Sequence, residues 1–395
     1  MHTTPDKSTS QASEKVVVTA TALVTALGDD IETVWQRLLN RESAIRLIAR
    51  FDVDRECYAA KVAALIQDLK RRGDRSLLIP LLDRLIDTLG TVPADAALIA
   101  ATIKSGIDNL ESICRGDRAA FEDILLSALG RQIDQSAGPM RANSGGPAGK
   151  PVCISASCAS SAIAVAQGAA MITSGLADAV LICCADIVTE YVFSGFSCLK
   201  ALSPSPCQPF DRDRRGLSLG EGAAALLLMS DRRAKKEGRN ILGTIRGWGV
   251  SNDAAHITAP ARGGKGLIQA VDDALNAARI PTGEIAAICA HGTGTVYNDR
   301  MELDAFGHVF GRRKLPVFSV KGSLGHMLGA AGGVEIILSL KALAAGTVPP
   351  TVGFQNPDIG AAGRVSADAQ SIAAGCLLTT NSGFGGVNAA VVVGR

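Results

Sequence analysis

Three side chains in this sequence have types and surroundings suited to nucleophilic acyl chemistry. Cys158 lies in ISASCASSA (154–162), where a short apolar run changes to small residues. His291 lies in AHGTGT (290–295), and His326 lies in KGSLGH (321–326). A thiolate can accept an acyl group as a thioester, and two imidazole N–H groups can stabilise an enolate or oxyanion. This set therefore predicts acyl transfer followed by a step that develops negative charge.

The residues around Cys158 predict a buried strand that turns abruptly into a helix. Residues 151–155 form a short β-branched run, and residues 159–175 are small enough for a closely packed helix. A thiol at this junction is near unpaired backbone N–H groups and the positive end of the helix dipole, which favour the thiolate. The alternative is a small apolar core cysteine, and this segment alone leaves the two interpretations about even.

Glycines flank both histidines, and threonines lie beside His291. Glycines let a backbone or substrate approach closely, and the neighbouring threonines supply hydroxyls for an amide-bearing substrate arm. A single histidine after a strand is more often structural, but two in Gly-rich loops favour a site. A papain-like protease needs one histidine and an Asn or Asp partner, which leaves the second histidine unexplained.

The rest of the chain alternates apolar strands with helices, which is typical of parallel or mixed sheets covered on both faces. Residues 136–150 are predicted to form a loop, and residues 193–215 an irregular segment. The predicted strands are 16–20, 96–101, 178–185, 221–230, 241–250, 285–290, 316–320, 376–380 and 389–393. The predicted helices, besides 159–175, are 29–39, 77–89, 121–129, 267–279 and 325–343.

A weak internal repeat indicates two related halves. Each half has a buried strand, then a reactive side chain, then a helix of very small residues, beginning near Cys158 and near His326. We expect a polar tail at 1–15, a half at 16–235 that carries the nucleophile, and a half at 236–395 that carries both histidines.

Composition excludes several classes of function. The 395 residues are 47% hydrophobic and carry a formal charge of +2, which gives no reason to expect nucleic acid or a membrane surface as partner. None of the ten cysteines forms a C-x-x-C pair, so we expect reduced thiols and no metal site. Residues 1–15 lack an apolar signal region, and no apolar run approaches the ~20 residues that span a bilayer. These features predict a cytoplasmic protein.

Six motifs occur in the order typical of one family. They are SASCASSAIA (155–164), PFDRDRRGLSLGEGAA (209–224), SNDAAHITAP (251–260), AHGTGTVYNDRME (290–302), KGSLGHMLGAAGGVE (321–335) and NSGFGGVNAA (381–390). From Val16 to the C-terminus the chain resembles the β-ketoacyl-[acyl-carrier-protein] synthases, condensing enzymes of the thiolase superfamily. The resemblance implies a five-layered αβαβα fold of two pseudo-symmetric halves and an acyltransferase. Such an enzyme extends acyl chains in fatty acid, aryl polyene or polyketide biosynthesis by decarboxylative Claisen condensation.

The resemblance implies a role for each motif residue. Cys158 would accept the acyl group, His291 and His326 would hold the malonyl thioester carbonyl, and Lys321 would tune His326. The N–H groups of Cys158 and Phe384 would form an oxyanion hole, and the Phe384 side chain would act as a gate. Thr293 and Thr295 would hydrogen-bond the phosphopantetheine arm. Glu302 and Glu335 would support the site. The enzyme itself would need no cofactor, because the arm belongs to the carrier protein.

The sequence departs from the family pattern near the acyl pocket. Lys104, in ATIKSGI (101–107), stands where many relatives have an apolar residue, and we expect it to contact the substrate. Arg215 replaces a common Asp, and Ser382 replaces an aromatic residue. These differences favour a specialised synthase for polyenes or other secondary metabolites over a housekeeping enzyme.

The implied partners are acyl- and malonyl-loaded carrier proteins and a second subunit, either an identical chain or a related one. Two basic clusters, Arg71/Arg72/Arg75 and Arg312/Arg313/Lys314, could meet an acidic carrier, although a solvated surface is the favoured interpretation.

Three related classes of protein fit less well. A non-catalytic subunit like a chain-length factor is the main alternative, and the intact Cys158, His291 and His326 disfavour it. A thiolase would carry a second cysteine, and the turn at 383–386 has none. A synthase that primes on acyl-coenzyme A would be expected to pair its cysteine with one His and one Asn.

Overall fold

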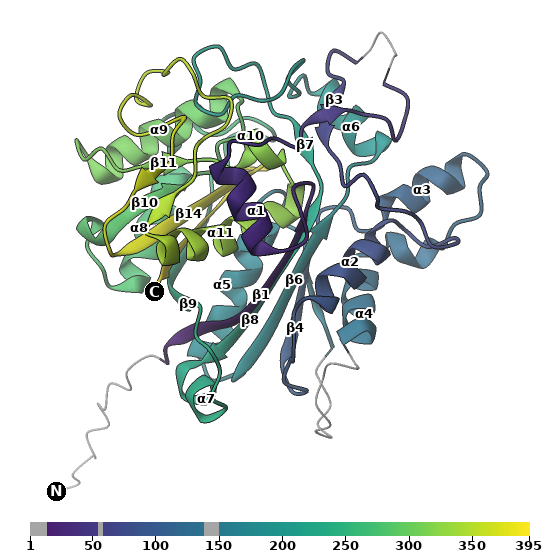
Figure 1. The fold of residues 1–395 in the computed structure, drawn as a ribbon, viewed down its shortest axis with the longest axis horizontal. Helices are drawn as coiled ribbons and strands as arrows, with labels where there is room; N and C mark the ends of the chain where they lie inside the picture. The colour runs from purple at the N-terminus through teal and green to yellow at the C-terminus, as the bar shows by residue number, and fades with distance from the viewer. Residues whose placement is uncertain (1–13, 54–57, 138–149) are drawn as a thin grey trace, which may run out of the picture.

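A continuous ten-stranded sheet forms the centre of the molecule (Figure 1). The computed structural model describes residues 14–53, 58–137 and 150–395. The strand order is β11-β10-β14-β15-β9-β1-β8-β6-β4-β5. The N-terminal strands are β1 (Val16–Thr25), β4 (Ala97–Ala101), β5 (Val152–Ile154), β6 (Ala179–Asp186) and β8 (Gly222–Ser230). The C-terminal strands are β9 (Gly243–Asn252), β10 (Ile285–Cys289), β11 (Val317–Phe318), β14 (Cys376–Gly383) and β15 (Val387–Gly394).

The two halves of the sheet repeat the same pairing. β1 is antiparallel to β8 and β8 to β6, whereas β6 is parallel to β4 and β4 to β5. In the same way β9 is antiparallel to β15 and β15 to β14, and β14 is parallel to β10 and β10 to β11. This repeat confirms the prediction of two pseudo-symmetric halves. The boundary predicted between residues 235 and 236 lies at the end of α7 (Asp231–Lys236), between β8 and β9.

Helices form the remaining layers. α5 (Ser160–Thr173) and α11 (Ala331–Ala345) pack together and contact strands of both halves of the sheet. α2 (Leu78–Asp87) and α4 (Leu126–Ala137) cover the outer face of the N-terminal half, and α8 (Lys265–Ala278) covers that of the C-terminal half. Each half of the continuous sheet forms one layer. The order of layers is therefore helix, half-sheet, helix, half-sheet, helix, as the five-layered αβαβα thiolase-like fold requires.

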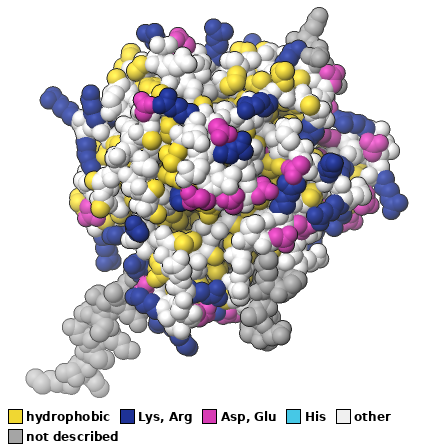
Figure 2. Space-filling model, viewed as in Figure 1, with side chains coloured by type: hydrophobic (Ala, Val, Ile, Leu, Met, Phe, Trp, Pro, Cys, Tyr) yellow, Lys and Arg dark blue, Asp and Glu magenta, His cyan; other side chains and the backbone are white. Residues whose placement is uncertain are grey.

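Shorter elements complete the chain. The other helices are α1 (Ile31–Leu39), α3 (Ile107–Cys114), α6 (Glu190–Cys198), α9 (Val296–Phe310) and α10 (Lys321–Leu324). Two small sheets pair β2 (Arg46–Leu47) with β3 (Val62–Ala64) and β7 (Leu219–Gly220), and β12 (Thr347–Val348) with β13 (Gln370–Ser371). On the face in Figure 2, Lys and Arg side chains are interspersed with Asp and Glu, as expected for a nearly neutral chain.

Small residues let the two central helices approach each other and the sheet. A Cβ added at Gly333 would lie 2.5 Å from Cys184 Sγ, and one at Gly332 would lie 3.1 Å from Ala162 Cβ. The segment Leu328–Ala345 is long and apolar enough to cross a membrane, but 78% of it is buried inside the molecule. It is therefore a core helix of this fold.

Some predicted elements differ from the structure. The helix predicted from residue 325 begins at Ala331, because Gly325 and Leu328 have positive φ and the chain turns before the helix. The segment predicted as irregular from residue 193 begins with α6, whose start is capped by Thr189 accepting a bond from the Val192 N–H.

Two other predictions are altered. The helix predicted at 121–129 is a 3-10 turn (Phe121–Ile124) followed by α4. α4 continues to Ala137, into the predicted loop, whose residues 138–149 lie outside the described residues. α9 was not predicted, because the buried polar residues Asn298, Asp299 and Glu302 interrupt the apolar pattern of a helix.

Gly333→Ala should lower the free energy of unfolding by roughly 1–3 kcal/mol, because its methyl group would force Cys184 or the helix to move. The matched control is Gly307→Ala in α9, where a Cβ meets nothing within 4 Å. That change should raise stability by roughly 0.5–1 kcal/mol. Urea unfolding of both variants measures the difference, and equal effects would contradict the close packing of the central helices.

Candidate active site

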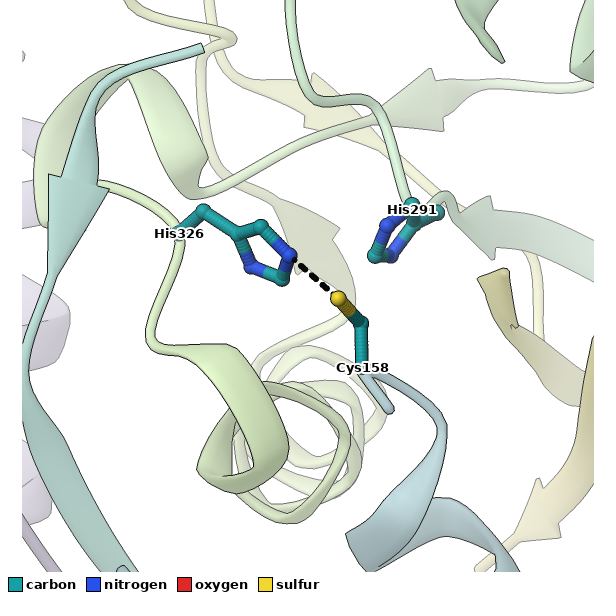
Figure 3. A group of neighbouring side chains, drawn as sticks. All are labelled: Cys158, His291 and His326. Atoms are coloured by element: carbon teal, nitrogen blue, oxygen red, sulfur yellow. Dashed lines mark hydrogen bonds between the residues drawn. The ribbon is translucent and has the colours of Figure 1, made fainter. Parts of the chain in front are cut away.

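The structure brings Cys158, His291 and His326 together (Figure 3). Cys158 follows β5, His291 follows β10, and His326 follows β11 and α10. Cys158 Sγ lies 2.9 Å from His326 Nε2, and the two imidazole rings are edge to face with centroids 5.1 Å apart. Strand ends from both halves of the sheet therefore meet at one point.

Cys158 is presented by a tight turn before α5. Ser157 has a φ of 51°, an unusual value for a residue with a side chain. Ser160 holds the turn, since its hydroxyl donates to the Ser157 carbonyl and accepts from the Ala156 N–H at 2.9 Å. The strand-turn-helix prediction is confirmed, and the thiol lies in the interior with 6% of the residue exposed.

Burial decides the protonation of the thiol. It raises the pKa of Cys158 to about 12, with a further upward contribution from Asp186, while the Lys321 cation acts in the opposite direction. Desolvation of the charged form therefore outweighs the Cys158 backbone N–H, which lowers the pKa in the direction that the sequence predicts. Cys158 rests as a neutral thiol that needs a proton acceptor.

Both histidines are kept neutral. Burial, and then the Lys321 charge, lower the pKa of His291 and His326 well below the usual value. The Nδ1 atoms of both rings are buried without a hydrogen-bond partner among the described residues. Because no neighbour fixes the tautomer, each Nε2 can serve as acceptor or donor.

Glu302 holds the backbone beside His291. Its carboxylate accepts the N–H groups of His291 at 2.8 Å and Gly292 at 2.7 Å, and the Thr380 hydroxyl at 2.9 Å. Burial raises the pKa of Glu302 to about 7. The supporting contact is therefore to the loop that carries His291 and not to the ring.

Lys321 and Glu335 form an ion pair in the core, and both side chains are shielded from solvent. Asn381 donates to the second carboxylate oxygen of Glu335 at 2.7 Å. Glu335 offsets part of the charge of Lys321, but the Lys321 charge still lowers the pKa of both imidazoles. Lys321 thus acts on the histidines electrostatically.

A cavity of about 330 Å³ opens onto Cys158 and both histidines. Thr293, Thr295 and Phe384 are among the residues that line it. The hydroxyls of Thr293 and Thr295 are 2.9 Å apart, and the Phe384 ring stacks on Phe196 with centroids 5.6 Å apart.

The segment that carries Phe384 approaches the nucleophile closely. A Cβ added at Gly383 would lie 3.0 Å from the Cys158 nitrogen, and the Ser157 hydroxyl donates to the Phe384 carbonyl at 2.9 Å. The two predicted oxyanion donors therefore belong to adjoining segments of backbone.

Lys104 is not among the residues that line this cavity. Its side chain is exposed, and its Nζ lies 5.9 Å from the centroid of the Tyr191 ring on α6. The structure therefore does not bring Lys104 together with the other site residues, and its contact with substrate stays a prediction.

The first basic cluster is already paired with acidic side chains. Arg71 binds Asp108, Arg75 binds Asp123, and Arg72 binds Asp83. Asp108 and Asp123 are buried, so Arg71 and Arg75 stabilise the structure locally and are not simply solvated. Free basic groups occur instead near the mouth of the cavity, where Lys200 and Arg215 are exposed lining residues.

The ligand atoms of Cys158, His291 and His326 lie within 4.8 Å of one another, a spacing that a metal ion could also use. A thiol with a pKa of about 12 and the nearby Lys321 charge both oppose a bound cation. The absence of a metal from the site stays a prediction.

Sequence reasoning missed two residues of this region. Phe196 lies in the segment predicted to be irregular, and Asp186 lies one residue beyond the predicted strand 178–185. A single carboxylate that ends such a strand was the available signal for Asp186.

Comparisons with known proteins agree with this geometry. The N-terminal domain of β-ketoacyl synthases matches residues 138–234, and the C-terminal domain matches residues 242–355. The 3-oxoacyl-[acyl-carrier-protein] synthase 2 of Vibrio cholerae is 31% identical over 96% of this chain and 99% of its own. That of Mycobacterium tuberculosis is 30% identical over 98% and 99%.

Solved structures of ketosynthases have the same fold. The ishigamide ketosynthase/chain length factor superposes with a TM-score of 0.86 at 28% identity, over 97% of this chain and all of that one. A β-ketoacyl synthase from Burkholderia phymatum also gives 0.86, at 25% identity over 97% and 99%. By sequence and by fold, this chain belongs to the β-ketoacyl synthase family.

Proposed function

We propose that this protein is a 3-oxoacyl-[acyl-carrier-protein] synthase that joins an acyl group to a malonyl unit with loss of CO₂. The observation that carries the proposal is the convergence of one buried thiol and two neutral imidazoles on a single cavity. A non-catalytic chain-length-factor-like subunit would have no use for the 2.9 Å contact between Cys158 and His326.

The first half-reaction transfers the acyl group to the enzyme. His326 Nε2 accepts the thiol proton as Cys158 Sγ attacks the acyl thioester carbonyl. The backbone N–H groups of Cys158 and Phe384 stabilise the oxyanion. The carbon–sulfur bond to the carrier then breaks, and the carrier sulfur leaves with the proton from His326.

The second half-reaction extends the chain. The bond from the malonyl carbon to its carboxylate breaks, and CO₂ leaves its electron pair in an enolate. Nε2–H donors of His291 and His326 stabilise the enolate oxygen. The enolate carbon attacks the acyl carbonyl on Cys158, the carbon–sulfur bond breaks, and the released thiolate takes a proton that comes from solvent.

The remaining residues bind the substrate arm and the partners. Thr293 and Thr295 hydrogen-bond the phosphopantetheine arm of the carrier protein along the cavity. Lys200 and Arg215 at its mouth supply positive charge for an acidic carrier. The enzyme works in the cytoplasm without a cofactor of its own.

The second subunit binds at the edge of the sheet. Within the described chain β5 is the last strand, and Val152 on it is 46% exposed. Two solved structures of similar fold, including one from Xenorhabdus doucetiae at 24% identity, join a ketosynthase to a chain length factor. The second subunit is therefore either a related chain or an identical copy of this one. The enzyme acts in a polyene or polyketide pathway.

Cys158→Ala should abolish acyl loading and retain malonyl decarboxylation, because the two histidines remain. His326→Ala should reduce condensation by about 10²- to 10⁴-fold, as expected for loss of a positioned acid–base group, while Cys158 is still acylated slowly. Mass spectrometry of enzyme incubated with acyl- and malonyl-carrier proteins follows both outcomes. Acyl loading on another residue would refute the role of Cys158.

Alkylation of Cys158 by iodoacetamide tests the raised pKa of its thiol. In His326→Ala the rate should be low at pH 7 and rise about tenfold per pH unit, because the pKa of the buried thiol is about 12. Peptide mass spectrometry from pH 7 to 10 measures the slope, with exposed Cys198 as the internal control. A plateau below pH 9 would contradict the raised pKa.

Charge reversal at the cavity mouth tests carrier binding. Lys200→Glu with Arg215→Glu should weaken affinity for acyl-carrier protein at least about tenfold and reduce its dependence on salt. Arg312→Glu, on an exposed residue of the second basic cluster, is the control. Equal effects of the two reversals in a binding titration would place the docking surface elsewhere.

A further inference from the structure

Asp186 is a buried carboxylate at the end of β6, next to the active site. It is 1% exposed and accepts the Thr102 hydroxyl at 2.7 Å, the Ile103 N–H at 3.0 Å and the Gly329 N–H at 2.8 Å. The Lys104 N–H also donates to it, at 3.5 Å, so four donors converge on Asp186 from two different segments. A carboxylate suits this place because it only accepts, whereas an amide would turn an N–H toward another N–H.

Asp186 joins the two halves of the molecule beside His326. Thr102 and Ile103 follow β4 in the N-terminal half, whereas Gly329 lies three residues after His326 in the C-terminal half. The approach is close, since a Cβ at Gly329 would lie 2.6 Å from Asp186 Oδ2. Leu328, just before it, has a φ of 53°.

The turn that carries His326 is held at both of its ends. On one side the His326 N–H donates to the Ser218 carbonyl at 2.7 Å, and the His326 carbonyl accepts from Gly220 at 3.0 Å. On the other side the Gly329 N–H donates to Asp186. The 2.9 Å contact between His326 and Cys158 therefore depends on an anchor in each direction.

The pseudo-symmetry of the sheet adds an independent comparison. Cys184 pairs with Ala101, and Thr379 pairs with Cys289, the last residues of β4 and β10. Two residues further on, Asp186 and Asn381 occupy equivalent positions. Asn381 binds Glu335 on α11 in its own half, whereas Asp186 binds the opposite half.

We propose that Asp186 is a positioning residue for His326, and that its carboxylate holds the His326 turn at the distance from which the imidazole takes the Cys158 proton. The inference rests on the proposed function for the role of His326. Asp186 does not contact Cys158 directly in this role; it acts through the backbone of Gly329.

A second effect of Asp186 changes the reactivity of Cys158 in the opposite direction, which lets an experiment separate the two effects. Its negative charge contributes to the raised pKa of Cys158. Neutralising Asp186 should therefore increase the thiolate fraction, while releasing the Gly329 N–H should move His326 away. Only the second effect requires the histidine.

The experiment compares Asp186→Asn in the wild-type and His326→Ala backgrounds, with full-length protein. Iodoacetamide alkylation of Cys158 at pH 8 should fall about tenfold in the first background, because misplacing a catalytic group by about 1 Å costs up to 10²-fold. In the second background the rate should not fall. Thr102→Val, which removes a donor on the other side of the carboxylate, should leave the alkylation rate unchanged.

Thermal unfolding verifies that each variant is folded. If Asp186→Asn does not fold, Gly329→Ala disturbs the same contact, because its Cβ would lie 2.6 Å from Asp186 Oδ2, and it should slow alkylation in the same way. An equal fall in both backgrounds, or no fall in the wild-type background, would overturn the proposal. Alkylation needs no carrier protein, so it tests this inference separately from condensation. If alkylation follows the expected pattern but the enzyme catalyses no condensation, the proposed function is refuted and this inference stands.

Discussion

The active site depends on how closely α5 and α11 pack between the two halves of the sheet. Each helix begins just after one of the proposed catalytic side chains, so the distance between the helices sets the distance between Cys158 and His326. A glycine at the crossing permits this approach, because a Cβ at Gly332 of α11 would lie 3.1 Å from Ala162 Cβ of α5. Interiors packed at crystal-like density transmit such changes instead of absorbing them. The smallest residues of the chain therefore determine the geometry of its most reactive ones.

Burial then favours the neutral form of the thiol and of both imidazoles. The thiol and both imidazoles rest neutral, and the Lys321 charge is paired with Glu335. A neutral site is suited to a reaction in which negative charge appears on the substrate and is then consumed. The donors are oriented before the charge develops, so little reorganisation is needed.

Much of the site could be predicted from the sequence because its parts are local. The small residues around Cys158 and the glycines around His291 and Phe384 are typical of tight turns and close backbone contacts, so they indicate these features directly. The protonation of Cys158 could not be predicted, since it depends on burial by segments distant in the chain. For the same reason the bonds of Asp186 to Gly329, and of Arg71 to Asp108, leave no local pattern. α9 was not predicted, because buried polar residues that support the site interrupt the apolar face of this helix.

The supporting strand of the nucleophile is unusually short. β5 has three residues, ends four positions before Cys158 and is the last strand of the described sheet. Its other neighbour in an assembly would be another chain, bonded to the same three residues of backbone. The identity of that chain would thus bear directly on the rigidity of the turn at Ser157. If the proposed second subunit pairs with β5, its identity also decides how firmly Cys158 is held.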